Sequence, residues 1–502
     1  MAQDTLKNEY AKLVRDLETN KGDDWVKERE IKCLDLFRKA AESVPAYRKF
    51  LKKNKVVAQN IKTWKDFQSV PLIGKKNYIS VYPYNELYWD GLLDKPLVYT
   101  STSGSTGKPF YFARDNKLDW QHSIISELFV KRRMTSKDTP ALFIICFGMG
   151  VWIGGLINFK SMDILVHRQR YPISIITPGI NINEILNILK NIAPNYKQVI
   201  MAGYPPLVKD VIDEALKIGI EMDKLNLRLL FAAESISEEF RDYIAEKGKV
   251  KDLYQDIINI YGSAELGAMA QESLVCTLIR RLANGDSNLA KAVFRQTEKF
   301  PTLAQFIPRF TSFEQIRNKI VVTGDSAIPL IRYDIGDNGG VISYDEMCNK
   351  LSRLGINLEN EIKEKKLKQV YKLPFVYVYE RSDLSTSFYG LNVYPEWIKP
   401  ALYKLEIRDV LTGKFMLATK LNRNKDQILE INIEMRSGKR ATSRLVARVL
   451  ESVMTSLMKR SSEYREICNQ LKKRAIPKLV FWPYHHGAYF CSGVKQKWVE
   501  KN

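Results

Sequence analysis

The sequence predicts an α/β fold, with a large N-terminal domain of mostly parallel sheets flanked by helices and a small α+β C-terminal domain. Apolar runs at 198–202, 227–232 and 257–260 alternate with segments of helical periodicity, which is the pattern of βα units. The 502 residues exceed what one hydrophobic core organises. After Asp383 the alternation gives way to short strands and one amphipathic helix at 445–457.

These changes in sequence pattern divide the chain into three predicted segments. Residues 1–95 are predicted to form a helical leader packed on the large domain, with breaks at Pro45 and Pro71. Residues 96–383 are expected to form the core of the large domain, and residues 384–502 the C-terminal domain.

The large domain opens with a predicted helix at 118–133 and an apolar run at 141–159. That run is nearly long enough to cross a bilayer, but four glycines interrupt it. The interruption favours a buried strand followed by a glycine-rich loop around Met149 and Trp152 over a transmembrane helix. Such a loop admits a flat ligand to the backbone or forms a tight packing turn.

The clearest βα units follow. Pro206 suits the first turn of an amphipathic helix, and Gly219 suits its C′ position. Glu234 and Glu265 come just after two predicted strands. Because ligands of parallel sheets bind beyond the carboxyl ends of the strands, both are candidate site residues.

The rest of the large domain is less regular. We expect a basic, helical elaboration at 273–318, a strand at 319–323, a turn at 329–337 and a solvated helix at 349–368.

The six cysteines lie apart, without a CxxC pair, which argues against a disulfide framework and a zinc site. A charged, helix-prone N-terminus lacks the features of a signal peptide. These observations predict a cytoplasmic protein.

The formal net charge is +21, and residues 384–502 hold 22 Lys and Arg against 10 Asp and Glu. Nucleic acid, an anionic membrane, phosphate-rich ligands and a solvated surface are all compatible with this excess. No nucleic-acid-binding motif accompanies it, so we favour a phosphate-rich ligand or an acidic protein partner over sequence-specific nucleic acid.

Residues 102–109 read Thr-Ser-Gly-Ser-Thr-Gly-Lys-Pro between two β-prone runs. Glycines expose backbone N–H groups, hydroxyls donate hydrogen bonds, and Lys108 adds charge, which suits a polyphosphate. The loop is not a Walker A motif, because only two residues separate Gly104 from Gly107 and Pro109 follows the lysine. The alternative is an ordinary hairpin tip.

Six motifs occur in order along the chain: TSTSGSTGKP (100–109), AAES (232–235), YGSAELG (261–267), IRYDIGD (331–337), ERSD (380–383) and SGVKQKW (492–498). Together they resemble the adenylate-forming (acyl-activating) superfamily, in particular its phenylacetate–CoA ligase-like, capsule-biosynthesis branch. The resemblance covers almost the whole chain and implies that the C-terminal domain is a mobile lid.

The resemblance implies nucleotide contacts from five motifs. The loop would wrap the β- and γ-phosphates of ATP through Thr102, Ser103, Gly104, Ser105, Thr106, Gly107 and Lys108. Ala233 and Glu234 would lie against the adenine, and Tyr261, followed by Gly262 and Ser263, would stack on its face. Asp337 would accept hydrogen bonds from the ribose hydroxyls, and Arg381 would contact the ribose or a phosphate.

The resemblance also implies the reacting groups. Glu265 and Thr106 would hold Mg²⁺, Asp383 would be the hinge of the lid, and Lys495 would bridge the substrate carboxylate and the α-phosphate. Lys497 is the alternative catalytic lysine.

The substrate pocket is the least defined part of the expected site. Candidate lining residues are Gly148, Met149, Trp152, Tyr204 and Ala264. An apolar, glycine-lined pocket suits an aromatic or medium-length hydrophobic acid. The pair of His485 and His486 lies near Lys495 in sequence and either lines the site or has a surface or packing role.

The implied activity is ATP-dependent formation of an acyl-adenylate, followed by acyl transfer to coenzyme A. An amine acceptor, giving an amide, is an alternative, and so is a stand-alone adenylyltransferase. A carrier protein is a possible partner. A basic nucleic-acid- or membrane-associated protein is the remaining alternative class.

Overall fold

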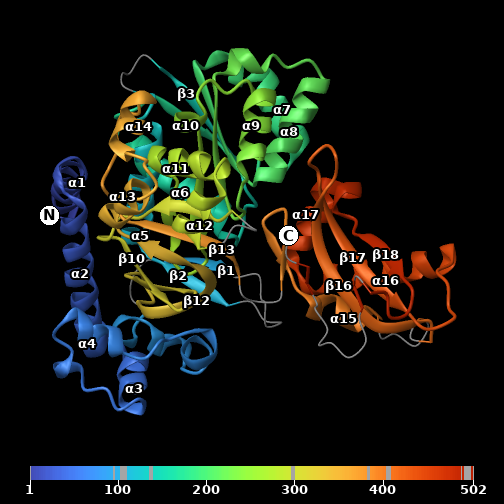
Figure 1. Cartoon of the computed structure of the whole chain (residues 1–502), viewed down its shortest axis with the longest axis horizontal. Coiled ribbons are helices and arrows are strands. Elements are labelled where there is room, and N and C mark those ends of the chain that lie inside the picture. Colours follow the sequence, from blue (N-terminus) through green and yellow to red (C-terminus); the bar gives the residue numbers. More distant parts are fainter. Residues whose placement is uncertain are drawn as a thin grey trace.

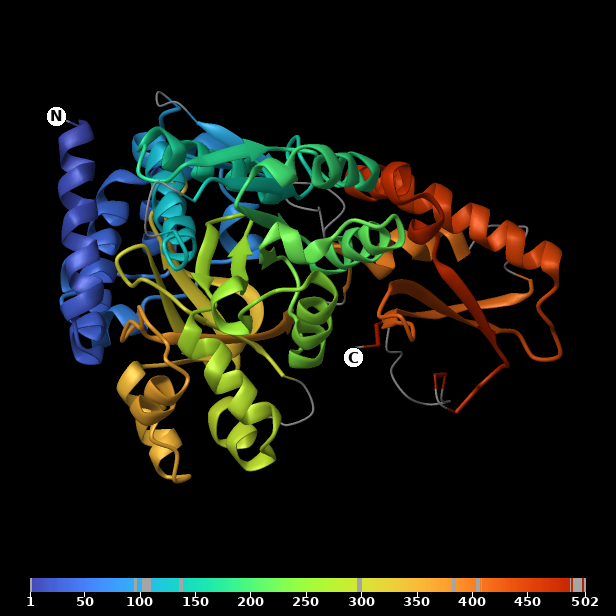
Figure 2. The ribbon, with the colours of Figure 1, turned by 90° about the horizontal axis from the view of Figure 1, so that it is seen from above.

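A computed structural model describes residues 2–93, 97–101, 110–134, 139–295, 300–381, 385–402, 407, 409–487, 489–490 and 499–500. A large domain carries the N-terminal helices along one side and the C-terminal domain on the opposite side (Figures 1 and 2). The α/β fold class is confirmed.

An eleven-stranded sheet of order β10-β11-β12-β13-β9-β8-β7-β6-β5-β3-β4 organises the large domain. The strands β4, β3, β5, β6 and β7 are parallel to one another, and every other neighbouring pair of this sheet is antiparallel. The parallel half therefore corresponds to the predicted βα units. Its strands are β3 (Ala141–Cys146), β4 (Ile173–Ile176), β5 (Gln198–Gly203), β6 (Leu227–Ala232) and β7 (Ile257–Ser263).

Strand β3 shows why the sequences of the parallel strands are continuous apolar runs. Its residues alternate between two cores: Phe143 and Ile145 pack against α5 and α6, whereas Ile144 and Cys146 pack against α7 and α8. Helices cover both faces, so both sets of side chains are buried and apolar. The covering helices are α5 (Asn116–Val130), α6 (Ile153–His167), α7 (Ile182–Asn191), α8 (Pro205–Lys217), α9 (Glu238–Gly248) and α10 (Leu253–Asp256).

The apolar run at 141–159 is strand β3, a short turn and the start of α6, as the buried-strand interpretation predicts. Gly154 and Gly155, however, belong to α6 and not to a loop. None of the helices in the described part has the length and apolar character needed to cross a bilayer. The predicted end of α8 is confirmed, since Gly219 has φ +79° just after the helix.

The antiparallel half differs from three predictions. Most of the expected turn at 329–337 lies within β12, and the segment at 273–318, expected to be helical, contains two helices followed by β9 and β10. The single helix expected at 349–368 is instead the end of α13, a connection and α14. Polar and charged residues occur among the buried positions of β10 and β12, so these segments lack the continuous apolar runs of the parallel strands. The elements are β8 (Gly267–Gln271), α11 (Leu274–Asn284), α12 (Ser287–Phe294), β9 (Thr302–Gln305), β10 (Thr311–Ile316), β11 (Lys319–Gly324), β12 (Leu330–Ile342), α13 (Tyr344–Ser352), α14 (Leu358–Glu364) and β13 (Phe375–Arg381).

The N-terminal helices pack against the large domain. They are α1 (Ala2–Thr19), α2 (Gly22–Ser43), α3 (Pro45–Lys53) and α4 (Trp64–Ser69). Aromatic side chains such as Phe37, Tyr47 and Tyr78 share one core with Phe313 and Tyr333 of the antiparallel strands. A separate hairpin, β1 (Val98–Ser101) and β2 (Tyr111–Arg114), flanks the predicted phosphate loop.

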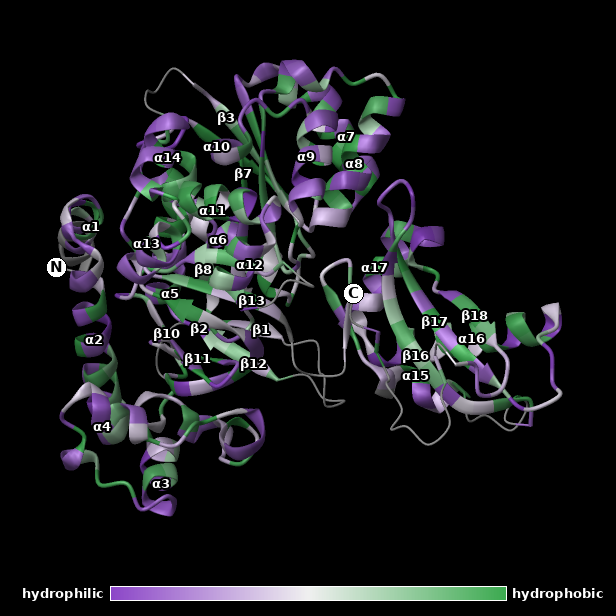
Figure 3. Cartoon of the chain, viewed as in Figure 1, coloured by the Kyte–Doolittle hydropathy of each residue, from purple (hydrophilic) through white to green (hydrophobic). Residues whose placement is uncertain are grey.

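The C-terminal domain is a small α+β unit. Its elements are β14 (Thr386–Phe388), β15 (Leu391–Val393), α15 (Pro395–Leu402), β16 (Leu411–Leu421), β17 (Gln427–Met435), α16 (Ser443–Arg460), α17 (Ser462–Leu471) and β18 (Lys478–Trp482). The predicted amphipathic helix is α16, which buries Leu445, Val449, Val453 and Leu457. In Figure 3 the apolar positions of β16 and β17 lie inside a polar exterior. The predicted boundary, Asp383, lies outside the described residues.

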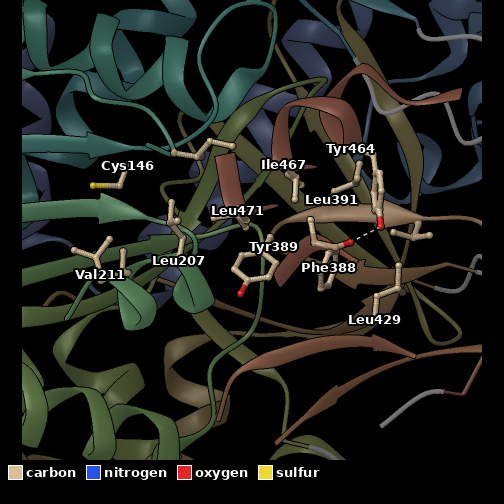
Figure 4. Close-up of a cluster of buried hydrophobic side chains, with 14 of the residues drawn as sticks. Cys146, Leu207, Val211, Phe388, Tyr389, Leu391, Leu429, Tyr464, Ile467 and Leu471 are labelled. Carbon is tan, nitrogen blue, oxygen red and sulfur yellow. Dashed lines mark hydrogen bonds between the residues drawn. The ribbon is translucent and has the colours of Figure 1, made fainter. Parts of the chain in front are cut away.

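One apolar cluster joins the two domains. Leu207 and Val211 of α8 belong to the same buried cluster as Phe388, Tyr389 and Leu471 of the C-terminal domain (Figure 4). Gly390 approaches so closely that a Cβ there would lie 2.4 Å from the Tyr204 ring. The domains are therefore packed core to core along α8.

Buried charges complete this interface. Lys209 of α8 pairs with Asp426 across the boundary and lies 2.8 Å from Asp213. Asp210 accepts a hydrogen bond from the Tyr389 hydroxyl at 2.7 Å and pairs with Arg474 at 2.8 Å. Because Lys209 and Asp210 are almost fully buried, each depends on these partners.

We predict that Lys209→Met lowers the free energy of unfolding by about 3 kcal/mol, because the buried Asp210 and the partly buried Asp213 and Asp426 lose a counter-charge. Lys217→Met is the matched control on the same helix: its ammonium is exposed and pairs with Glu214 three residues away. We expect the control to change stability by less than about 1 kcal/mol. Urea denaturation measures both, and equal effects would contradict the role of Lys209.

Candidate functional site

A cavity of 820 Å³ lies between the two domains, at the carboxyl ends of the parallel strands. Residues that follow β3, β5, β6 and β7 line it from the large domain, for example Phe147, Tyr204, Ala233 and Ser263. The C-terminal domain contributes Ser387, Gly390, Asn392, Thr419, Gln427 and Glu463, among others. Its size suits a small organic ligand, and its position follows the rule for parallel sheets.

The end of β6 is a strained turn. Ala233 has φ +74°, a left-handed backbone that costs about 1 kcal/mol or more for a residue with a side chain. This turn brings Ala233 to the cavity and directs Glu234 to the C-terminal domain. The Glu234 carboxylate accepts hydrogen bonds from Gly390 N at 2.5 Å and Gln427 Nε2 at 2.7 Å. Glu234 therefore lines the cavity and also ties the domains together.

Tyr261 and Asp337 meet on the cavity wall. The Tyr261 hydroxyl, from β7, donates to Asp337 Oδ2, from β12, at 2.5 Å. The two strands are not neighbours in the sheet, so this hydrogen bond connects the parallel and antiparallel halves. Gly262 follows Tyr261 where the backbone is crowded, since a Cβ there would lie 2.7 Å from the Gly267 carbonyl oxygen.

Glu265 is buried in the turn between β7 and β8 and also lines the cavity. Its Oε1 lies 3.3 Å from Lys75 Nζ and accepts a hydrogen bond from the Tyr333 hydroxyl at 3.2 Å. Lys75 reaches this position because the leader bonds to β12 at Ile73. No cluster of three or more His, Cys, Asp or Glu side chains suited to a metal occurs in the part of the chain that is described.

His122 of α5 contacts the turn between β7 and β8. Its Nε2 accepts a hydrogen bond from the Ala268 N–H at 2.6 Å, which requires a neutral imidazole. Burial, together with the nearby Arg114 charge, lowers the pKa of His122 to about 3. Only glycine fits opposite the ring: Gly267 has φ +64°, and a Cβ there would lie 2.3 Å from His122 Cε1.

The apolar end of the cavity is lined by Phe147, Trp152, Ile157 and Tyr204. Phe147 and Tyr204 pack edge to face at 5.0 Å, and burial raises the pKa of Tyr204 well above its usual value. Of the predicted pocket residues, Trp152, Tyr204 and Ala264 line the cavity.

Gly148 and Met149 lie behind that wall. A Cβ on Gly148 would lie 2.6 Å from Trp152 Cε3, and one on Gly155 would lie 2.6 Å from Met149 Sδ. The glycine-rich segment is therefore a tight packing turn, the second of the two predicted alternatives.

Three lining residues were missed by the sequence analysis. Lys75 lies in a leader segment with no strong pattern, and His122 looks like an ordinary polar position of a helix. Asn259 of β7 donates to the Glu234 carbonyl oxygen at 2.9 Å, while its Oδ1 is buried without a hydrogen bond. A polar residue inside the apolar run 257–260 was the one signal available for Asn259.

Several predicted site residues cannot be placed. Residues 102–108, including the candidate metal ligand Thr106, lie outside the described residues, as do Asp383 and Lys495. The backbone of Arg381 pairs with Asp337 in the β12–β13 ladder, but its side chain is not described. His485 packs on Tyr484 and His486 on Trp482.

We predict that His122 makes the fold acid-sensitive. Its folded pKa is about 3 and its unfolded pKa about 6.5, so its stabilising contribution is complete above pH 6.5 and is lost as the pH falls toward 3. Between pH 7 and pH 5 the loss is about 2 kcal/mol. His122→Gln, which keeps an acceptor, should reduce this pH dependence by that amount in urea denaturation.

The control is His167→Gln. His167 is exposed at the end of α6, so its replacement should leave the acid dependence unchanged. Identical pH profiles for the His122 variant and the wild type would show that the imidazole is not held neutral.

No protein-family model matches the chain, and no curated protein matches it by sequence. Among solved structures, a 2-hydroxyisobutyryl-CoA ligase in complex with 2-HIB-AMP and coenzyme A, in the thioesterification state, has a TM-score of 0.60 and 14% identity. The similarity covers 94% of this chain and 90% of that one.

An amide bond synthetase from Marinactinospora thermotolerans has a TM-score of 0.44 and 12% identity, over 82% of this chain and 72% of that one. The fold conclusion rests on the 2-hydroxyisobutyryl-CoA ligase alone. The chain shares the fold of this adenylate-forming ligase along almost its whole length.

Proposed function

We propose that the protein is an ATP-dependent ligase, an enzyme that converts a carboxylic acid to an acyl-adenylate with release of pyrophosphate and then transfers the acyl group. The observation that carries the proposal is the convergence of Tyr261, Glu265 and Asp337 on one cavity between two domains. These residues come from two of the motifs on which the family resemblance rests, and the fold agrees with it. The phenylacetate–CoA ligase-like branch is part of the proposal.

The nucleotide would occupy the wall formed by the ends of β6 and β7. Asp337 supplies a carboxylate for both ribose hydroxyls, and the hydrogen bond from Tyr261 orients it. The Ala233 turn and the Asn259 amide offer hydrogen-bonding groups beside the Tyr261 ring, which suits a purine. In this arrangement the Glu234 contribution is its backbone, because its carboxylate serves the C-terminal domain.

Mg²⁺ would be held by Glu265, with Thr106 of the loop as a second oxygen ligand. A single protein carboxylate fits this ion, because Mg²⁺ keeps several waters and binds substrate phosphates. When bound, it neutralises charge on the ATP phosphates. Glu265 lies 3.3 Å from the Lys75 ammonium, so this carboxylate already faces one positive charge of the protein.

The first half-reaction needs positioning more than acid–base catalysis. A substrate carboxylate is already a nucleophile, and the barrier comes from bringing two anions together and from charge on the leaving pyrophosphate. We assign Ser103, Gly104, Ser105, Gly107 and Lys108 to the leaving phosphates. Lys495 would hold the carboxylate against the α-phosphate, and Asp383 would be the hinge of the C-terminal domain.

The acid would bind at the apolar end of the cavity. Phe147, Trp152 and Ile157 offer an apolar wall, and Tyr204 closes it beside the C-terminal domain. Such a wall suits an aromatic or medium-length hydrophobic acid. Two acyl acceptors are compatible with this proposal: coenzyme A, which the 2-hydroxyisobutyryl-CoA ligase complex contains, and an amine.

We predict that the wild type exchanges pyrophosphate into ATP in the presence of a carboxylic acid found by screening for pyrophosphate release. Asp337→Asn should lower kcat/KM for ATP by about 10²-fold, because two hydrogen bonds to an ionised acceptor are weakened. Lys495→Ala should abolish exchange.

The control is Asp334→Asn, three positions away on β12, whose carboxylate pairs with the exposed Lys319. It should exchange at the wild-type rate. Unchanged exchange in both the Asp337 and the Lys495 variant would refute the site assignment. Exchange without consumption of coenzyme A or any amine would identify a stand-alone adenylyltransferase.

A further inference from the structure

Helix α17 places a carboxylate of the C-terminal domain at the cavity. Glu463 is the second residue of this helix, lines the cavity and interacts electrostatically with Tyr204 of the large domain. Two buried hydrogen bonds hold the helix in place. Ser461 Oγ accepts one from the Tyr464 N–H at 3.0 Å. The Tyr464 hydroxyl donates the other to the Ala475 carbonyl oxygen at 2.6 Å (Figure 4). The position of Glu463 is therefore set by the core of its domain.

Glu463 differs from the other carboxylates of the cavity wall. Within the described residues, its carboxylate makes no hydrogen bond or ion pair with the protein. Each of the other lining carboxylates has a protein partner. Three accept a hydrogen bond, namely Glu234 from Gln427, Glu239 from Asn284 and Asp337 from Tyr261. Two form an ion pair, namely Glu265 with Lys75 and Glu500 with Lys420. Glu463 thus borders the cavity with its hydrogen-bonding capacity unused by the described protein.

The cavity wall is acidic although the chain is basic. Among its described residues, six carboxylates face two lysines, Lys75 and Lys425. From the C-terminal domain, the charged lining residues are Glu463, Glu500 and Lys425. The basic excess of that domain therefore lies mostly away from the described cavity wall. An acidic wall attracts a cation such as an alkylammonium ion.

We propose that Glu463 binds an amine as the acyl acceptor and takes up its proton, so that the second half-reaction forms an amide. The proposal rests on the proposed adenylation. One proton of the ammonium passes to Glu463, and the nitrogen lone pair attacks the acyl carbon. The C–O bond to AMP then breaks, AMP leaves with the electron pair, and the second proton goes to water.

The environment of Glu463 suits this role. Burial raises the pKa of Glu463 to about 7, so the side chain accepts and releases a proton near neutral pH. Tyr204 lines the apolar end of the cavity, where the acyl group would be, packs on Phe147 and interacts electrostatically with Glu463. Glu463 and the proposed acyl site therefore share Tyr204 as a neighbour.

The test uses the full-length protein and the acid found by the pyrophosphate screen, with a panel of primary alkylamines, hydroxylamine and coenzyme A as acceptors. Mass spectrometry measures amide, hydroxamate and thioester, and pyrophosphate exchange measures adenylation. For Glu463→Gln we expect exchange within twofold of wild type and amide formation about 10²-fold slower. Hydroxylamine is uncharged at pH 7 and needs no initial deprotonation. The rate of hydroxamate formation should therefore fall less than about fivefold in this variant.

The matched control is Glu466→Gln, one turn later on α17, where the carboxylate accepts a hydrogen bond from Gln470 at 3.0 Å. It should match the wild type in every assay. Thioester formation that outpaces amide formation with every amine would overturn the role of Glu463 and leave the proposed function intact. Equal losses of exchange and amide formation in Glu463→Gln would also overturn it. Absence of exchange with every acid would instead refute the adenylation itself.

Discussion

The cavity depends on the packing of the C-terminal domain against helix α8. Lys209 is buried there among carboxylates of both domains, and its burial is tolerable only while Asp426 stays in place. Close contact between Gly390 and Tyr204 leaves no room for a shifted register. Because these contacts fix how the two domains pack, they determine which groups of each domain face the cavity.

Glu234 shows how site and interface are combined. The strained backbone at Ala233 turns the chain out of the sheet, so the same two residues line the cavity and hold the C-terminal domain. Rotation of that domain would break three hydrogen bonds to one carboxylate. A ligand that occupies the cavity can offset that loss with its own contacts, which couples binding to domain position.

Much of the site could be predicted from the sequence because its residues lie in short local motifs. Tyr261, Glu265 and Asp337 were each identified from local motifs, and all three meet at the cavity. Lys75 and His122 were not identified, because neither lies in a motif and both reach the site through long-range packing. The strand at 330–342 was mistaken in part for a turn, since Pro329 precedes it and charged residues and glycines interrupt its apolar pattern.

The sequence by itself determined the βα units, the helix ends such as Gly219, and the two-domain α/β class. These features depend on backbone conformation and on the period at which side chains become buried, which neighbouring residues encode. Only the tertiary structure decided that Glu234 serves the interface and that Glu463 borders the cavity. Periodicity reports that a side chain is buried or exposed, but not which distant segment lies against it.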